Sequence, residues 1–349
     1  MSIPQAPNLG QFLRTNGLYT IAGYTYAAPL PGGGANFTAL FEDGPKKAVA
    51  KFFFMGPSAI AEKRFRNELH NHRESRKYKA ILPEIYEEFA SSDGFVRGYI
   101  MEFVDGILLE KLIPSAGFGE TEELYGAFYR VVWAYHSALR GYVHGDLHPG
   151  NIFFTSDMAD WLDRRPESPE VRILDLGASI SPYCFGYDEA FDAELWSDHH
   201  KRFAGSFYSL APEFLTDGYT AAMQSPGKVD CWALGLLLYK MVTGDLLNVA
   251  DSLGQFAADI SNGSLQRRLD QSIDQSIMGY HLKTLQKLML RVSPAERIDL
   301  ATATSFIGQL YNQDHELLSR KGATLNNYVA HGCDPEWQLP PHERSNSPY

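Results

Sequence analysis

The pattern of hydrophobic and polar positions divides the chain into a strand-rich first part and a helical second part. Residues 19–54 are rich in aromatic and small side chains, and turn signals at 31–34 and 42–45 divide them into a strand, a loop and a hairpin. Residues 58–79 are charged and have the spacing of a helix. Short apolar runs predict strands at residues 48–54, 81–86 and 96–104.

Downstream of Asp105 and Gly106 the periodicity changes to that of helices. Residues 120–141 carry apolar side chains at steps of three and four. These side chains predict one buried helix face, formed by Leu124, Phe128, Val131, Val132 and Tyr135. Residues 313–349 end in a polar, proline-containing stretch, which predicts an appended tail. The order of the elements therefore predicts an α+β fold in which a small sheet precedes a larger helical part.

Composition and charge exclude several classes of protein. The chain has 349 residues, 44% of them hydrophobic and 21% charged, which is enough for roughly two domains and excludes a disordered polypeptide. Its net charge of −11 argues against sequence-independent binding of nucleic acid, which needs clustered Lys and Arg. Three widely spaced cysteines exclude a zinc finger and a disulfide scaffold. The chain begins without a secretory signal, and its longest apolar run, at 232–239, is too short for a membrane segment, so we expect a cytoplasmic protein.

Two separate segments carry the candidate chemistry. Asp146 is followed five residues later by Asn151, and Asp175 follows a short apolar strand in the sequence Asp-Leu-Gly. A phosphoryl-transfer site needs one carboxylate that orients the incoming hydroxyl, and an Asn and a second Asp that hold magnesium on the phosphates of ATP. Asp146, Asn151 and Asp175 meet these requirements in that order. The sequence therefore predicts ATP and Mg²⁺ as cofactors.

With these residues the chain resembles the protein kinase superfamily. Residues 144–151, His-Gly-Asp-Leu-His-Pro-Gly-Asn, are similar to the catalytic loop of bacterial-type and aminoglycoside kinases. The resemblance implies a two-lobed, kinase-like fold with a small β-rich N-lobe and a larger helical C-lobe. The divisions that it implies are an N-terminal extension, the N-lobe, the C-lobe and a C-terminal tail, at residues 1–17, 18–104, 105–312 and 313–349.

The resemblance also implies roles for residues around the nucleotide. Lys51 resembles the strand lysine that grips the α- and β-phosphates, and Glu68 is its expected partner on a helix, with Glu62 as a competitor. A glycine loop would cover the phosphates with backbone N–H groups, and a hinge would bind adenine. The residues assigned to the glycine loop are Gly32, Gly33 and Gly34, and those assigned to the hinge are the gatekeeper Met101 and the backbone of Glu102 and Val104.

Motifs further along the chain distinguish a protein kinase from a small-molecule kinase. Residues 205–213 resemble the peptide-docking end of an activation segment, and residues 229–235 resemble the start of the helix beneath it. Arg297 resembles the late arginine that pairs with a glutamate, here Glu213. Ser206 stands where serine/threonine kinases carry a threonine that bonds the catalytic Asp. These motifs favour a protein acceptor.

Several positions depart from the family pattern. Gly145 replaces an arginine, so a phosphate on the activation segment would lack its usual basic partner. His148 replaces a lysine that touches the γ-phosphate, and a neutral imidazole would give a weaker or pH-dependent contact. A zinc pair of His144 and His148 is not expected because Pro149 opposes a helix there, and we interpret His144 as a structural histidine. Asp230 is interpreted as a helix-capping carboxylate.

The sequence predicts an ATP- and Mg²⁺-dependent protein serine/threonine kinase. Asp146 would accept the proton of the substrate hydroxyl, Lys51 would anchor the phosphates, and His148 would steady the γ-phosphate. Two alternatives stay open. The sequence of residues 144–151 favours a kinase of aminoglycosides or sugars. A pseudokinase that acts as a binding module is favoured by His148 and by the irregular glycine loop, in which Phe37 or Thr38 stands where a third glycine is expected. The expected partner is a protein substrate. The sequence defines neither the identity of this substrate nor the oligomeric state of the chain.

Overall fold

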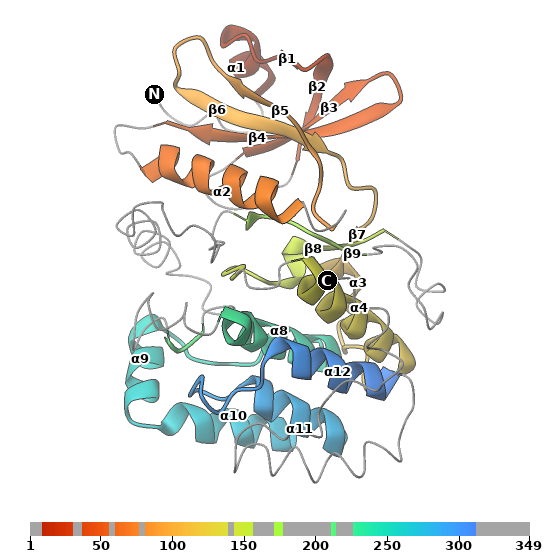
Figure 1. Ribbon diagram of the computed structural model, residues 1–349, viewed down its shortest axis with the longest axis vertical. Coiled ribbons are helices and arrows are strands. Elements are labelled where there is room, and N and C mark those ends of the chain that lie inside the picture. Colours follow the sequence, from red (N-terminus) through yellow and green to blue (C-terminus); the bar gives the residue numbers. More distant parts are fainter. Residues whose placement is uncertain are drawn as a thin grey trace.

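The computed structural model describes residues 9–30, 37–55, 60–76, 81–138, 143–155, 171–176, 211–213 and 226–311. This part of the chain forms two lobes, with the β-rich lobe above the helical lobe in Figure 1. The predicted α+β organisation, a small sheet followed by a larger helical part, agrees with this arrangement. The predicted glycine loop at 32–34, Ser206 and the predicted tail at 313–349 lie outside the described residues.

The N-terminal lobe is an antiparallel sheet with one helix on each side. The strand order is β1-β2-β3-β4-β6-β5. The elements of this lobe are α1 (Leu9–Thr15), β1 (Thr20–Ile21), β2 (Tyr24–Pro29), β3 (Phe37–Asp43), β4 (Lys46–Phe54), α2 (Ile60–Arg76), β5 (Ile85–Ala90) and β6 (Val96–Glu102). Helix α1 falls within the segment predicted as an N-terminal extension, and its Leu9 and Leu13 are buried in the core of the sheet.

Strand β4 is apolar on both faces, and this explains why it lies in the middle of the sheet. Successive side chains of a strand point to opposite faces. Ala50 and Phe52 therefore pack into the core that includes α1, whereas Phe53 packs against Phe65 of α2 with ring centroids 5.3 Å apart. Lys51 shares the face of Phe53, so the alternation along β4 turns this lysine toward α2.

The strand predicted at residues 81–86 is wrong in position, because β5 occupies Ile85–Ala90. Ile81 and Leu82 are buried in the core of the other lobe, and the carbonyl of Ile81 accepts a hydrogen bond from the amide of Ile173 at 2.9 Å. These two apolar side chains pack into the helical lobe and are not part of a strand. The other predicted strands and helices match observed elements to within a few residues at each end.

The C-terminal lobe is helical and is joined to the sheet lobe through a small sheet of order β7-β8-β9. In Figure 1 this small sheet lies between α2 and the lower helices. The elements of the lobe are β7 (Ile107–Leu108), α3 (Leu109–Leu112), α4 (Glu122–Ala138), η2 (Pro149–Asn151), β8 (Ile152–Phe154), β9 (Val171–Ile173), α8 (Pro226–Thr243), α9 (Leu253–Ser261), α10 (Ser264–Gln275), α11 (Tyr280–Met289) and α12 (Leu300–Tyr311).

Helix α8 forms the centre of the helical lobe. Trp232, Leu234 and Leu238 on this helix are completely buried, and each buried leucine contributes about 2 kcal/mol through the hydrophobic effect. The apolar run at 232–239, which the sequence indicated is too short for a membrane segment, is therefore part of a core helix. None of the helices in the described ranges is long and apolar enough to cross a membrane.

Candidate active site

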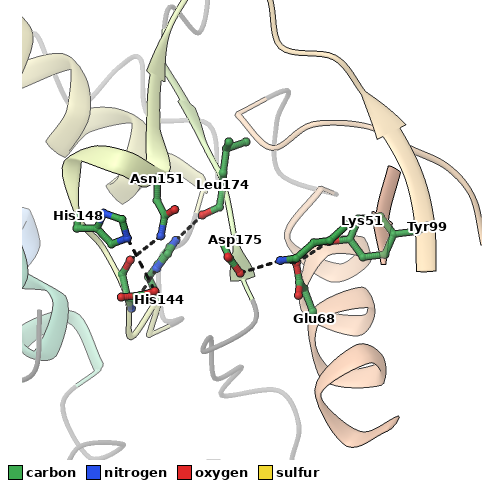
Figure 2. A network of polar contacts seen from close by, with 9 residues as sticks. Lys51, Glu68, Tyr99, His144, His148, Asn151, Leu174 and Asp175 are labelled. Atoms are coloured by element: carbon green, nitrogen blue, oxygen red, sulfur yellow. Dashed lines mark hydrogen bonds and ion pairs between the residues drawn. The ribbon is translucent and has the colours of Figure 1, made fainter. Parts of the chain in front are cut away.

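Lys51 joins the two lobes through ion pairs. The residue is 5% exposed, and its Nζ donates to Oε1 of Glu68 at 2.6 Å and to Oδ1 of Asp175 at 3.0 Å (Figure 2). Burial by itself lowers the pKa of Lys51, but the carboxylates of Asp175 and Glu68 outweigh burial and raise this pKa above its ordinary value. Lys51 therefore stays protonated at any physiological pH.

The structure places Glu68, and not Glu62, beside Lys51. Six residues along an α-helix turn a side chain by about 240°, so the two glutamates of α2 face different directions. Oε1 of Glu62 accepts hydrogen bonds from Nε of Arg66 at 2.6 Å and from Nη1 of Arg97 at 2.7 Å. Glu62 thus ties the start of α2 to β6, while Glu68 faces the site.

Asp175 lies just after β9 in a backbone conformation that is unusual for its residue type. Its φ is 61°, in the left-handed region, which costs a residue with a side chain of the order of 1 kcal/mol. The amide of the preceding Leu174 donates to the carbonyl of Asn151 at 2.8 Å, and Lys51 holds the Asp175 carboxylate. Figure 2 shows Asp175 between the Lys51 group on one side and Asn151 and His148 on the other. These contacts fix a carboxylate at the boundary of the lobes.

The loop that carries Asp146 is held from below by Asp230 of α8. The Asp230 carboxylate accepts the amide of His144 at 2.7 Å and the amide of Gly145 at 3.2 Å, and it also accepts a hydrogen bond from the hydroxyl of Tyr135. Asp230 is buried, and burial raises its pKa to about 6. It lies inside α8, which begins at Pro226. The interpretation of Asp230 as a helix cap is therefore wrong, because its carboxylate supports the loop instead.

His144 is a completely buried part of this loop. Its Nε2–H donates to the carbonyl of Leu174 at 3.0 Å, and its Nδ1 accepts the amide of Asp146 at 3.3 Å. This pattern requires the neutral ring, and burial lowers the pKa of His144 to about 4. The ring therefore joins the loop of Asp146 to the segment before Asp175, a structural role.

His148 takes a different orientation at the start of η2. Its Nδ1 accepts the amide of Gly150 at 3.1 Å, so the proton of the neutral ring is on Nε2. Nε2 lies 3.9 Å from Oδ2 of Asp146. Burial lowers the pKa of His148, so the ring is neutral near pH 7. His148 thus presents one N–H donor beside the carboxylate of Asp146.

Asn151 and Asp175 have the chemistry that a magnesium ion needs. Mg²⁺ prefers carboxylate and amide oxygens and is usually held by one or two protein ligands together with substrate phosphates. Nδ2 of Asn151 donates to the carbonyl of Asp146 at 2.9 Å, which leaves the amide oxygen as the group that can coordinate a cation. The described residues contain no group of three or more His, Cys, Asp or Glu side chains that could hold a metal ion. A site completed by phosphates fits this donor set.

The predicted hinge lies where β6 ends. Glu102 is the last residue of β6 and is paired with Ala48 of β4, and its amide donates to the carbonyl of Glu84 at 2.7 Å. Oε1 of its side chain accepts a hydrogen bond from Nη2 of Arg172 at 3.3 Å. Val104 follows two residues later outside any strand and is half-buried. The segment leads from β6 of the sheet lobe to β7 of the small sheet.

A second buried ion pair lies in the helical lobe, away from the lysine. Nη1 and Nη2 of Arg297 donate to the two carboxylate oxygens of Glu213 at 2.7 and 2.9 Å. The guanidinium also lies 5.2 Å from the centre of the Trp232 ring. This pair connects residues 211–213 to the segment between α11 and α12. Its role is architectural rather than catalytic.

Sequence reasoning missed one residue at the centre of the site. Tyr99 of β6 is 1% exposed, and its hydroxyl donates to Oε1 of Glu68 at 2.5 Å. The register pairs Lys51 directly with Tyr99, which puts both side chains on the same face of the sheet. The sequence shows a tyrosine two positions before Met101, but only the register of β4 and β6 reveals that this tyrosine lies beside Lys51.

The fold and the site together define a class of protein. A buried lysine bonded to a helix glutamate and to a carboxylate of the other lobe, next to an Asp and Asn on one loop, is the arrangement of a two-lobed kinase. In agreement, the family model for the protein kinase domain matches residues 37–311. The chain belongs to the protein kinase family.

Individual relatives are similar over shorter stretches. The chain is 30% identical over 149 residues to the serine/threonine-protein kinase Pkn1 of Myxococcus xanthus, which covers 42% of this chain and 18% of that protein. It is 29% identical over 190 residues to sperm motility kinase Z of Mus musculus, with coverages of 53% and 32%. It is 28% identical over 212 residues to calcium-dependent protein kinase 1 of Oryza sativa subsp. japonica, with coverages of 58% and 34%. The match thus spans about a third or less of the length of each relative.

Proposed function

We propose that this chain transfers the γ-phosphoryl group of ATP, with Mg²⁺, to serine or threonine hydroxyls of a protein substrate. The observation that carries the proposal is the 3.0 Å contact between Nζ of Lys51 and Oδ1 of Asp175. It brings a phosphate-binding cation of one lobe to a metal-binding carboxylate of the other, so a nucleotide between the lobes would meet both. Phosphoryl transfer depends mostly on such positioning and on charge neutralisation.

Each site residue then has a definite role. Asp146 accepts the proton of the acceptor hydroxyl, and Lys51, held by Glu68, binds the phosphates. Asn151 and Asp175 hold Mg²⁺, which when bound neutralises charge that develops on the phosphate oxygens. The backbone of Glu102 and Val104 binds adenine, a role that follows the family resemblance.

His148 serves as a donor to the γ-phosphate. A lysine at this position would present a full positive charge, whereas the neutral imidazole presents only its Nε2–H group, because Nδ1 is occupied by the amide of Gly150. A neutral hydrogen bond is weaker than a charge-assisted one. His148 therefore orients the phosphate and adds little charge stabilisation. Ser206, expected to bond Asp146, lies outside the described residues, and its role stays a prediction.

One observation favours a protein over a small molecule as the acceptor. The buried pair of Glu213 and Arg297 anchors the segment that the resemblance assigns to peptide docking. The name of the Myxococcus xanthus relative, a serine/threonine-protein kinase, also supports serine or threonine as the phosphorylated residue.

The proposal is tested by incubating the full chain with radiolabelled ATP and Mg²⁺. Casein and myelin basic protein serve as protein acceptors, and aminoglycosides and sugars are offered in parallel. We expect label on protein serine or threonine, and at least a thousandfold loss of label for Asp146→Asn and Asp175→Asn, because each removes a charge on which transfer depends. Asp274→Asn is the matched control, since the carboxylate of Asp274 pairs with Lys287 on the surface of the helical lobe.

Three outcomes would contradict the proposal in different ways. Label on an aminoglycoside alone would make the chain a small-molecule kinase. Binding of ATP and Mg²⁺ without transfer, detected as a rise in melting temperature, would make it a binding module. Transfer by Asp175→Asn at the rate of the wild type would show that the site has been assigned wrongly.

A further inference from the structure

The hydroxyl of Tyr99 donates a third-party hydrogen bond to the ion pair of Lys51 and Glu68. Oε1 of Glu68 accepts two short hydrogen bonds, one from Nζ of Lys51 at 2.6 Å and one from the hydroxyl of Tyr99 at 2.5 Å. The other carboxylate oxygen, Oε2, has no hydrogen-bond partner among the described residues. Figure 2 shows the Tyr99 ring alongside Lys51, with Glu68 reaching both from α2.

We propose that Tyr99 is a positioning residue that holds the Glu68 carboxylate, and through it helix α2 and Lys51, in the arrangement that binds ATP. The proposal rests on the proposed function for its effect on ATP. Its structural part, the attachment of α2 to β6 through a hydroxyl, stands on the geometry alone.

The first argument concerns rotation of the carboxylate. A carboxylate held at one oxygen by one lysine can turn about its terminal bond, because a lysine ammonium is a point charge with no directional fork. A second donor on the same oxygen from a different strand removes that freedom. Lys51 comes from β4 and Tyr99 from β6, and the register pairs these two residues directly. The rigid sheet thus fixes both donors that define the position of Glu68.

The second argument concerns the cost of moving α2 outward. Tyr99 is 1% exposed and Lys51 5% exposed. If Glu68 moved away, a buried hydroxyl and a buried ammonium would both lose an acceptor, and each such loss is costly in a dry environment. Apolar packing adds to this, since Tyr99, Phe53, Phe65 and Leu69 form one small core between the sheet and α2. The helix is therefore favoured in its inward position.

The groups around Glu68 keep the Tyr99 hydroxyl in the form that donates a hydrogen bond. Burial raises the pKa of Glu68, and the ion pair with Lys51 and the hydroxyl of Tyr99 both act against that rise. Tyr99 itself stays protonated, because burial and the neighbouring carboxylate raise its pKa well above the ordinary value. The hydroxyl is therefore a permanent donor, and removing it leaves the ring packing in place.

The experiment compares Tyr99→Phe with Tyr125→Phe in the full chain. Tyr125 is a matched control, because its hydroxyl also donates to a glutamate, Oε1 of Glu120, at 2.5 Å, but on α4 in the other lobe. For Tyr99→Phe we expect the KM for ATP to rise about tenfold, while kcat falls less and the KM for the protein acceptor stays within twofold. Tyr125→Phe should leave all three constants within twofold.

A purely structural role would give a different pattern. A lower fraction of folded enzyme reduces kcat without a change in the KM for ATP. A double-mutant cycle adds a second check, since Tyr99→Phe should change the KM for ATP less than twofold in the background of Glu68→Ala, because its effect passes through the Glu68 carboxylate. An equal, tenfold effect in both backgrounds would overturn the inference.

A readout without catalysis separates this inference from the proposed function. Hydrogen exchange of the amides of residues 60–76, in the protein without nucleotide, should be at least fivefold faster in Tyr99→Phe than in the wild type and unchanged in Tyr125→Phe. If no variant transfers phosphate but α2 exchanges faster in Tyr99→Phe, the proposed function fails and the attachment of α2 stands. Exchange at the wild-type rate would show that the attachment is wrong.

Discussion

The strongest prediction on stability concerns the buried pair of Glu213 and Arg297. The side chains are 1% and 0% exposed, so replacing Arg297 with Met leaves a carboxylate buried without its counter-charge. Breaking such a pair on one side destabilises a protein by about 3–5 kcal/mol. Methionine also cannot replace the hydrogen bonds that Arg297 donates to the carbonyls of Lys228 at 2.8 Å and Arg291 at 2.9 Å. We therefore expect Arg297→Met to lower the free energy of unfolding by about 4 kcal/mol.

Urea unfolding and thermal melting measure this loss. For a chain of 349 residues about 4 kcal/mol corresponds to a fall in melting temperature of about 5–6 °C. The control is Lys287→Met, which breaks the surface pair with Asp274 and should cost less than about 1 kcal/mol. The double variant Arg297→Met with Glu213→Leu should recover part of the loss, because the unpaired charge is removed. A loss below about 1 kcal/mol for Arg297→Met would refute this reasoning.

Two further predictions follow from the site. Glu68→Gln should reduce the rate of phosphoryl transfer at least tenfold, because it removes the charge that holds Lys51. Glu62→Gln on the same helix should change that rate by no more than about threefold, because Glu62 pairs near the surface. Initial rates with labelled ATP compare the two variants, and equal losses would contradict the assignment of Glu68. His144 has a pKa of about 4 in the folded chain and 6.5 as its ordinary value. Between these values only the unfolded chain binds the proton, so stability falls as pH falls, by about 2 kcal/mol between pH 7 and pH 5. Urea unfolding at both pH values should show a smaller difference for His144→Gln, and an unchanged difference would exclude His144 as the cause.

The sequence predicted more about the site than about the positions of some elements. Residue types and order selected Asp146, Asn151 and Asp175, and the family resemblance added Lys51 and Glu68. The structure places Lys51 in contact with Glu68 and Asp175, and the catalytic roles of all five residues stay predictions. The structure brings these residues to the boundary of the two lobes. Helix geometry separates Glu68 from Glu62, because six residues turn a side chain by about 240° around the helix axis. This rotation can be worked out from the sequence positions, but which of the two glutamates faces Lys51 required the structure.

Other features depended on contacts that no local pattern records. The apolar pair Ile81 and Leu82 has the composition of a strand, but it packs into the other lobe, and periodicity cannot distinguish these two reasons for hydrophobicity. Asp230 has the residue type of a helix cap, yet it serves a loop more than eighty residues earlier in the chain. Tyr99 acquires its role from the register of β4 and β6. Each of these required the tertiary structure.

The support that Asp230 gives to residues 144–145 has a consequence for how heat inactivates the protein. Surface loops usually fray before the helices beneath them melt, because they open locally at low cost. Here the amides of His144 and Gly145 donate to Asp230 of α8, and this carboxylate also accepts a hydrogen bond from the hydroxyl of Tyr135 of α4. We therefore expect the geometry around Asp146 to persist until the helical lobe as a whole unfolds, so that the helices and the proposed catalytic arrangement are lost in a single cooperative event.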